Sequence, residues 1–139
     1  MEGMRFIMIK LIASDLDGTI IDYNNQVAND NLTAINKLND TSINFAICTG
    51  KTYSMTKNIC NELHPTYGIF GNGTQIINLK TEEEIIRNVI TNEQAINCLK
   101  IAEDKNLNVH IYTENKIIAQ QELKYIGFRN YILYKNQVD

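Results

Sequence analysis

The N-terminal part of the chain alternates between short apolar runs and amphipathic stretches. Apolar runs bounded by charges or turn residues predict buried strands within residues 10–15, 43–50 and 67–77, the last continuing through a glycine turn into a further strand. Between them, apolar side chains recur at helical spacing over residues 30–38 and 54–63. Strands that alternate with helices predict right-handed crossovers and an α/β fold with a Rossmann-like parallel sheet.

Polar residues mark where the predicted helices begin. Asn29 and Asp30 are possible N-caps of the first helix, because their side chains can accept hydrogen bonds from free backbone N–H groups. A third amphipathic segment, residues 91–106, begins with Thr91 and Gln94, whose spacing fits a capping box. These positions predict two helix starts.

The pattern changes near residue 80, and we predict a domain boundary between Leu79 and Glu83. The acidic run there is most simply a solvated linker. After the helix over 91–106, residues 108–113 alternate in polarity and residues 115–119 contain another apolar run, which predicts antiparallel strands. The sequence therefore predicts an α/β part followed by an α+β part.

Composition narrows the possible partners. With 44% apolar residues, 21% charged residues and a net charge of −3, the chain has no basic excess that would attract nucleic acid. Its first residues lack a signal-peptide cleavage site and a span of about 20 apolar residues, and Lys10 interrupts them. We therefore expect a cytoplasmic protein with neither nucleic acid nor membrane as its partner.

Two carboxylates follow the first predicted strand. Asp15 and Asp17 lie just past its carboxyl end, where open α/β sheets bind ligands. Like charges this close repel each other unless a cation offsets them. Mg²⁺ prefers oxygen ligands and commonly binds one or two carboxylates together with a substrate phosphate. The pair therefore predicts a magnesium site at which one carboxylate attacks a phosphate and the other moves a proton.

Other interpretations of this segment compete with a magnesium site. An Asp-Gly pair between apolar residues is a common hairpin turn. A calcium-binding loop would need glycine where Ile20 stands and a bidentate glutamate where Gln26 stands, so that interpretation fails. A third interpretation is that Asp15 and Asp17 only cap a helix or solvate a loop. It does not explain why an apolar strand comes directly before them.

Three motifs in order carry a resemblance to a known family. "DLDGT" after the first strand, "ICTGK" at the end of the second and "FGNGT" at the end of the third resemble the haloacid dehalogenase (HAD) superfamily of phosphatases. More narrowly, the sequence is similar to the Cof-like branch of sugar-phosphate phosphatases, which insert a large cap after the third strand. The motifs cover roughly residues 9–79. The resemblance implies the N-terminal part of a HAD core over residues 1–79 and a partial α+β cap over residues 80–139.

The resemblance also implies roles for individual residues. Asp15 corresponds to the nucleophile that forms an aspartyl-phosphate, and its side chain to a ligand of the cofactor Mg²⁺. Asp17 corresponds to the general acid and base, with its backbone carbonyl as a second metal ligand. Thr49 and Gly50 correspond to the donors that bind the phosphoryl group, although Thr49 could equally cap the following helix. The implied substrate is a small phosphorylated metabolite such as a sugar phosphate.

Two further positions near the motifs receive no firm role. Lys51 stands where Cof-like proteins usually carry arginine, which keeps the charge but loses the planar fork, and we assign it no catalytic role. Asn72 follows the third strand and could face the site, but Asn-Gly is by default a turn pair.

Parts of the family's site have no counterpart here. The family needs a lysine beside the nucleophile and a later acidic cluster, and neither can be placed. The aspartates after Asp22 are isolated ones at Asp30, Asp40, Asp104 and Asp139. The resemblance therefore implies a truncated chain that hydrolyses little or nothing alone, with a non-catalytic remnant or interaction module as the alternative. A receiver-like phosphoacceptor is disfavoured, because the third strand carries no aspartate.

An incomplete sheet has a physical consequence. In this fold, later strands cover the free edge of the first strand, so a chain of this length leaves that edge open. Because an open apolar edge tends to pair, we expect self-association through the first strand, or cover from the chain's own residues 125–134.

Overall fold

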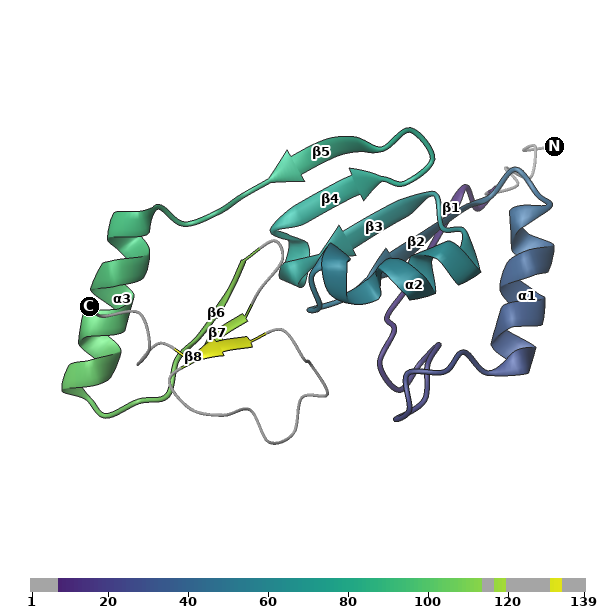
Figure 1. The fold of residues 1–139 in the computed structure, drawn as a ribbon. Helices are drawn as coiled ribbons and strands as arrows, with labels where there is room; N and C mark the ends of the chain where they lie inside the picture. Colours follow the sequence, from purple (N-terminus) through teal and green to yellow (C-terminus); the bar gives the residue numbers. More distant parts are fainter. Residues whose placement is uncertain (1–7, 114–116, 120–130, 134–139) are drawn as a thin grey trace, which may run out of the picture. The chain divides into compact units, whose positions relative to one another are not determined.

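The computed structural model describes residues 8–113, 117–119 and 131–133 (Figure 1). It divides into two compact units, Met1–Asn88 and Val89–Asp139. The elements of the first unit are β1 (Leu11–Ser14), α1 (Asn29–Asn39), β2 (Asn44–Cys48), α2 (Tyr53–Leu63), β3 (Tyr67–Phe70), the short 3₁₀ turn η1 (Gly71–Gly73), β4 (Gln75–Asn78) and β5 (Glu83–Arg87). Those of the second are α3 (Asn92–Asp104), β6 (His110–Tyr112), β7 (Ile117–Ala119) and β8 (Tyr131–Leu133).

The first unit is built on one five-stranded sheet in the order β1-β2-β3-β4-β5. β1, β2 and β3 run parallel, with Leu11 opposite Asn44 and Ala46 opposite Tyr67. Helices connect these three strands, as right-handed crossovers require. β4 and β5 extend the sheet in antiparallel fashion. The predicted α/β class with a Rossmann-like sheet is confirmed, and its parallel part is the part that the alternating pattern predicted.

β5 lies in the region that the sequence suggested was a linker. Glu83 and Glu84 belong to this strand, and all of its residues are exposed. Its pairing with β4 carries the first unit to Asn88, several residues later than the boundary predicted at 79–83. A strand exposed along its whole length needs no apolar alternation, because backbone hydrogen bonds alone place it. The interpretation of the two units as core and partial cap remains a proposal.

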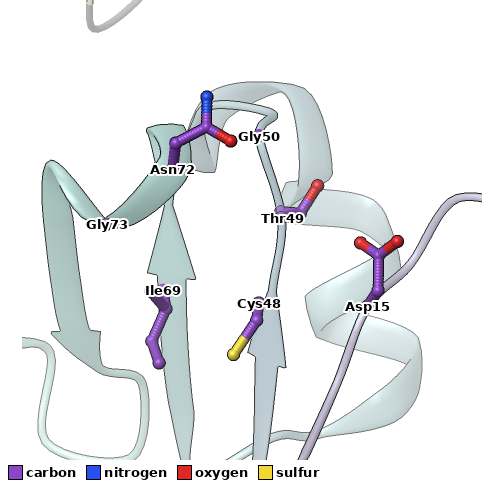
Figure 2. Close-up of a pocket in the computed structure, with 7 residues that line it drawn as sticks. All are labelled: Asp15, Cys48, Thr49, Gly50, Ile69, Asn72 and Gly73. Atoms are coloured by element: carbon purple, nitrogen blue, oxygen red, sulfur yellow. The ribbon is translucent and has the colours of Figure 1, made fainter.

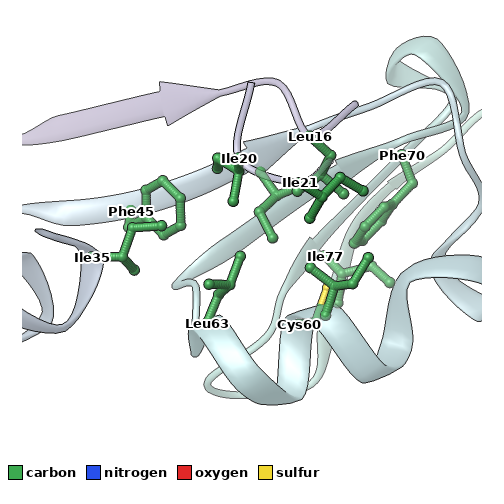
Figure 3. Packing of buried hydrophobic residues seen from close by; sticks show 11 residues of the cluster. Leu16, Ile20, Ile21, Ile35, Phe45, Cys60, Leu63, Phe70 and Ile77 are labelled. Carbon is green, nitrogen blue, oxygen red and sulfur yellow. The ribbon is translucent and has the colours of Figure 1, made fainter. Parts of the chain in front are cut away.

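The core of the first unit lies between the sheet and its helices (Figure 3). Leu16, Ile47, Leu63 and Phe70 are fully buried. Each such side chain contributes about 1.5–3 kcal/mol of stability relative to leaving it exposed. Their helix neighbours include Ile35, which the helical spacing placed on the buried face of α1.

The helix starts agree only in part with the sequence. α1 follows Ala28, which makes no side-chain cap hydrogen bond, so the predicted caps Asn29 and Asp30 are wrong by one residue or more. Asp30 instead lies in the first turn, where its negative charge suits the helix dipole. The capping box of α3 is confirmed by two reciprocal hydrogen bonds. The Gln94 backbone N–H donates to Thr91 Oγ1 at 3.2 Å, and the Thr91 backbone N–H donates to Gln94 Oε1 at 2.8 Å.

The second unit contains α3 and a three-stranded sheet in the order β6-β7-β8. β6 and β7 are antiparallel, as predicted, and β8 runs parallel to β7. We expected residues 125–134 as a possible cover for the edge of β1. Most of these residues lie outside the described part of the chain, and β8, which belongs to them, pairs with β7. No helix within the described residues is long and apolar enough to cross a membrane.

Candidate active site

The loop after β1 is fixed by a buried leucine between two exposed aspartates. Leu16 is fully buried, whereas Asp15 and Asp17 on either side are exposed. The Leu16 carbonyl accepts hydrogen bonds from the N–H groups of Ile20 and Ile21 at 2.9 and 3.0 Å. The turn that closes this loop has glycine at position 18 with φ of +73°, a conformation that favours glycine over residues with a side chain. The segment is therefore a tight turn that exposes both carboxylates.

A second turn continues this segment into a flap, which we define as residues 16–27. The Asp22 carboxylate accepts hydrogen bonds from the backbone N–H groups of Asn24 and Gln26 at 2.8 and 2.9 Å. The hydrogen bond from Gln26 is the main cause that lowers the pKa of Asp22, with those from Asn24 acting in the same direction and desolvation opposing them. The ionised carboxylate therefore stabilises the turn at the tip of the flap.

The flap should loosen in acid. Because the folded pKa of Asp22 is depressed, its stabilisation is present above its unfolded pKa of about 3.9 and is lost as the pH falls through the lower folded value. We expect Asp22→Ala to raise the exchange rates of the Asn24 and Gln26 amides already at neutral pH and to remove their acid-dependent step. Amide exchange followed by NMR measures both effects. Unchanged exchange at these two amides in the variant would contradict the role of the carboxylate.

Asp15 shares a pocket with the ends of the two neighbouring strands. The pocket has a volume of about 310 Å³ and is lined by Asp15, Cys48, Thr49, Gly50, Ile69, Asn72 and Gly73. In Figure 2 the Asp15 carboxylate and the Thr49 hydroxyl lie near each other at the carboxyl ends of their strands. Three residues singled out from the sequence, Asp15, Thr49 and Gly50, therefore line one site.

Backbone contacts hold the ends of β2 and β3 together beneath this pocket. Thr49 is buried, and its N–H donates to the Ile69 carbonyl at 2.9 Å. The N–H of Asn72 donates in turn to the Thr49 carbonyl at 3.3 Å. A Cβ on Gly50 would lie 3.0 Å from Asn72 Oδ1, so glycine at position 50 makes room for that side chain. Asn72, left undecided by the sequence, lines the site in the left-handed conformation with φ of +57°.

Cys48 also lines the pocket but is a poor nucleophile. Burial raises the pKa of its thiol above the ordinary value, and the nearby negative charge of Asp15 adds to this effect. A thiol with a raised pKa stays protonated at neutral pH, and the thiolate is the reactive form. We therefore do not expect the Cys48 thiol to act as a nucleophile in this pocket.

Asp17 is not among the residues that line this pocket and pairs instead with Lys51. Lys51 Nζ lies 2.6 Å from Asp17 Oδ1 and donates a second hydrogen bond to Asn25 Oδ1 at 3.0 Å. Sequence reasoning gave Lys51 no role. One signal could have found it, because β1 and β2 are parallel neighbours and Lys51 follows the end of β2 much as Asp17 follows that of β1.

The described residues supply few metal ligands. No group of three or more His, Cys, Asp or Glu side chains that could hold a metal ion occurs among them. The Asp15 carboxylate and the Asp17 backbone carbonyl are oxygen donors, which suit a hard cation such as Mg²⁺ that keeps several waters and binds substrate phosphate. This donor set therefore fits the predicted cofactor.

The fold and the site define an α/β protein that presents the Asp15 carboxylate in a pocket of about 310 Å³ at the carboxyl edge of its sheet. The family model of haloacid dehalogenase-like hydrolases matches residues 12–138. The chain therefore belongs to the haloacid dehalogenase-like hydrolases, and the resemblance to this superfamily is confirmed.

Individual relatives agree with this assignment. An HMP-PP phosphatase of Klebsiella pneumoniae (strain 342) is 29% identical over 108 residues, which cover 77% of this chain and 39% of the relative. A haloacid dehalogenase-like hydrolase from B. subtilis is 25% identical with a TM-score of 0.70, over 84% of this chain and 41% of that one. A sugar phosphatase of HAD subclass IIB shares the fold at 16% identity and a TM-score of 0.71, over 91% of this chain and 54% of that one. The chain thus spans about half the length of these relatives or less.

Proposed function

We propose that this chain carries the nucleophile and phosphate-binding part of a Mg²⁺-dependent phosphatase that acts on small phosphorylated metabolites. The observation that carries the proposal is the pocket in which the Asp15 carboxylate lies with Thr49 and Gly50. A carboxylate that lies beside hydrogen-bond donors in one pocket is what phosphoryl transfer to an aspartate requires.

The proposed reaction has two steps. An oxygen of Asp15 attacks the phosphorus, and the bond to the leaving oxygen breaks as Asp17 gives that oxygen a proton. Asp17 then takes a proton from water, whose oxygen attacks the phosphorus, releasing inorganic phosphate and restoring Asp15. The Thr49 hydroxyl and the Gly50 N–H donate to the phosphoryl oxygens in both steps. Mg²⁺, held by the Asp15 carboxylate and the Asp17 carbonyl, would neutralise negative charge on the phosphate.

The names of the relatives support the substrate class. One relative is an HMP-PP phosphatase and a structural neighbour is a sugar phosphatase, so both act on small phosphorylated compounds. The net charge of −3 on this chain also disfavours polyanions. We therefore propose a phosphorylated small metabolite, with sugar phosphates as the first class to assay.

Hydrolysis of p-nitrophenyl phosphate tests the proposal. The assay compares Mg²⁺ with excess EDTA, for the 139-residue chain and for any longer product of the same gene. We expect Mg²⁺-dependent release of p-nitrophenol in at least one of the two forms. Silence in both forms would reject phosphatase activity and favour the non-catalytic binding module.

The edge of β1 supports a proposal of self-association. Within the described residues β1 pairs only with β2, and Leu11 on it is 50% exposed. A charged side chain on an apolar edge strand discourages pairing. We expect the chain to sediment as a dimer or larger species and Leu11→Lys to shift it to monomer. The control is Ile85→Lys on β5, the strand at the opposite edge of the sheet, since Ile85 is also 50% exposed. If Ile85→Lys and not Leu11→Lys converts the chain to monomer, the contact between copies lies at β5.

A further inference from the structure

Lys51 is fixed at the point where three segments of the site meet. Its backbone N–H donates to Thr49 Oγ1 at 3.2 Å. Its carbonyl accepts a hydrogen bond from the Gly71 N–H at 2.9 Å, which ties it to the turn after β3. The main chain of Lys51 is therefore anchored to the ends of both β2 and β3.

The side chain of Lys51 reaches from this anchor to the flap. Its ammonium group bridges Asp17 at one end of the flap and Asn25 at its tip. Only 18% of the Lys51 side chain is exposed, compared with 55% for Asp17. The ion pair between Arg87 and Glu84 joins neighbours on a single strand. The Lys51 contacts, by contrast, connect residues far apart in the sequence and fix the flap in two places.

Both acceptors are presented by constrained backbone. Asn25 has φ of +58°, a left-handed conformation that asparagine tolerates better than most residues, and its N–H donates to the Asp22 carbonyl at 3.0 Å. Asp17 follows the buried Leu16, which anchors the near end of the flap. A single ammonium group with three donors can satisfy both oxygens at once.

We propose that Lys51 is a positioning residue that holds Asp17 and the flap in one arrangement beside the Asp15 pocket. Its catalytic consequence rests on the proposed function, because Asp17 is the group that moves the proton there. With the link broken, the Asp17 carboxylate samples more orientations, so fewer of them suit proton transfer to the leaving oxygen. Substrate binding through Thr49 and Gly50 is affected less, because neither depends on the Lys51 ammonium.

Amide hydrogen exchange of the 139-residue chain tests the link without any assay of activity. In Lys51→Met, which keeps the stem and removes the charge, we expect the Asp22 and Ala28 amides of the flap region to exchange about threefold faster or more. Lys51→Arg should restore wild-type exchange, since its guanidinium can also reach two acceptors. The control Lys57→Met, on the exposed side of α2, should change nothing.

A double-mutant cycle shows whether Lys51 acts through Asp17. If it does, Asp17→Ala and Lys51→Met each accelerate exchange in the flap, and the double variant is little faster than either one. Additive effects, or exchange in Lys51→Met that equals wild type, would overturn the proposal. A uniform increase over the β2 amides as well would also overturn it, because it would reflect general destabilisation.

Kinetics separates this inference from the proposed function. In an active form of the protein, Lys51→Met should lower kcat about tenfold or more and change KM by less than about twofold, while Lys51→Arg recovers most of kcat. A raised KM with unchanged kcat would overturn the positioning role. If no form hydrolyses p-nitrophenyl phosphate but the exchange results hold, the link stands and the proposed function fails.

Discussion

Asp15→Asn is expected to abolish hydrolysis of p-nitrophenyl phosphate, lowering kcat by about 10³-fold or more in any active form of the protein. Asparagine has nearly the same size as aspartate, so it fits the same place in the pocket with Thr49 and Gly50. Its uncharged amide cannot act as a nucleophile toward phosphorus and is a weaker ligand for a divalent cation. Initial rates at saturating substrate and Mg²⁺ measure the effect.

The control for this variant is Asp40→Asn. Asp40 is an exposed carboxylate at the C-terminal end of α1, outside the residues that line the pocket. The Asp40→Asn substitution should leave kcat within about twofold of wild type, because a surface carboxylate outside the pocket has little effect on the activation free energy of the reaction. Residual activity of Asp15→Asn above a few per cent would assign the nucleophile to another group. A trapped phosphoryl group on wild-type Asp15, detected by mass spectrometry, would support the assignment directly.

The sequence predicted the three parallel strands correctly, although β1, which it predicted to be buried, is largely exposed. β2 and β3 each bury one face in the core, and their apolar runs end at the glycine-containing segments that follow them. Asp15 and Thr49 could be placed near each other because parallel neighbours end at the same edge of a sheet. The positions of the strand ends in the sequence were therefore enough to predict that Asp15 and Thr49 lie at the same edge of the sheet.

The features that the sequence did not predict depend on contacts between distant residues. β5 has no apolar face to reveal it, and its position depends on backbone pairing with β4. The bridge from Lys51 to Asp17 and Asn25 depends on how the flap folds back, which local spacing does not encode. The start of α1 shifted for a similar reason, because Ala28 N–H donates to the Ile20 carbonyl at 3.4 Å and thereby fixes where the helix begins.

Gly68→Ala is expected to destabilise the first unit by about 2–3 kcal/mol, although alanine is ordinarily the better residue in regular structure. The reason is space and not backbone freedom, since Gly68 lies in a regular strand. A Cβ at this position would overlap the ring of Phe70, two residues along the same face of β3. Phe70 is fully buried and packs against Tyr53 with ring centroids 5.2 Å apart, so the ring cannot move aside without disturbing the core. Urea unfolding followed by circular dichroism measures the loss.

Phe70→Leu supplies the matched background for this prediction. Alone it should cost about 1–2 kcal/mol, since leucine fills less of the space that the ring occupies. In that background Gly68→Ala should cost less than about 0.5 kcal/mol, because a methyl group no longer meets the ring and the unfolded chain loses some freedom. The two substitutions are therefore expected to be strongly non-additive. If Gly68→Ala costs the same in both backgrounds, the glycine is required by the sheet itself and not by Phe70.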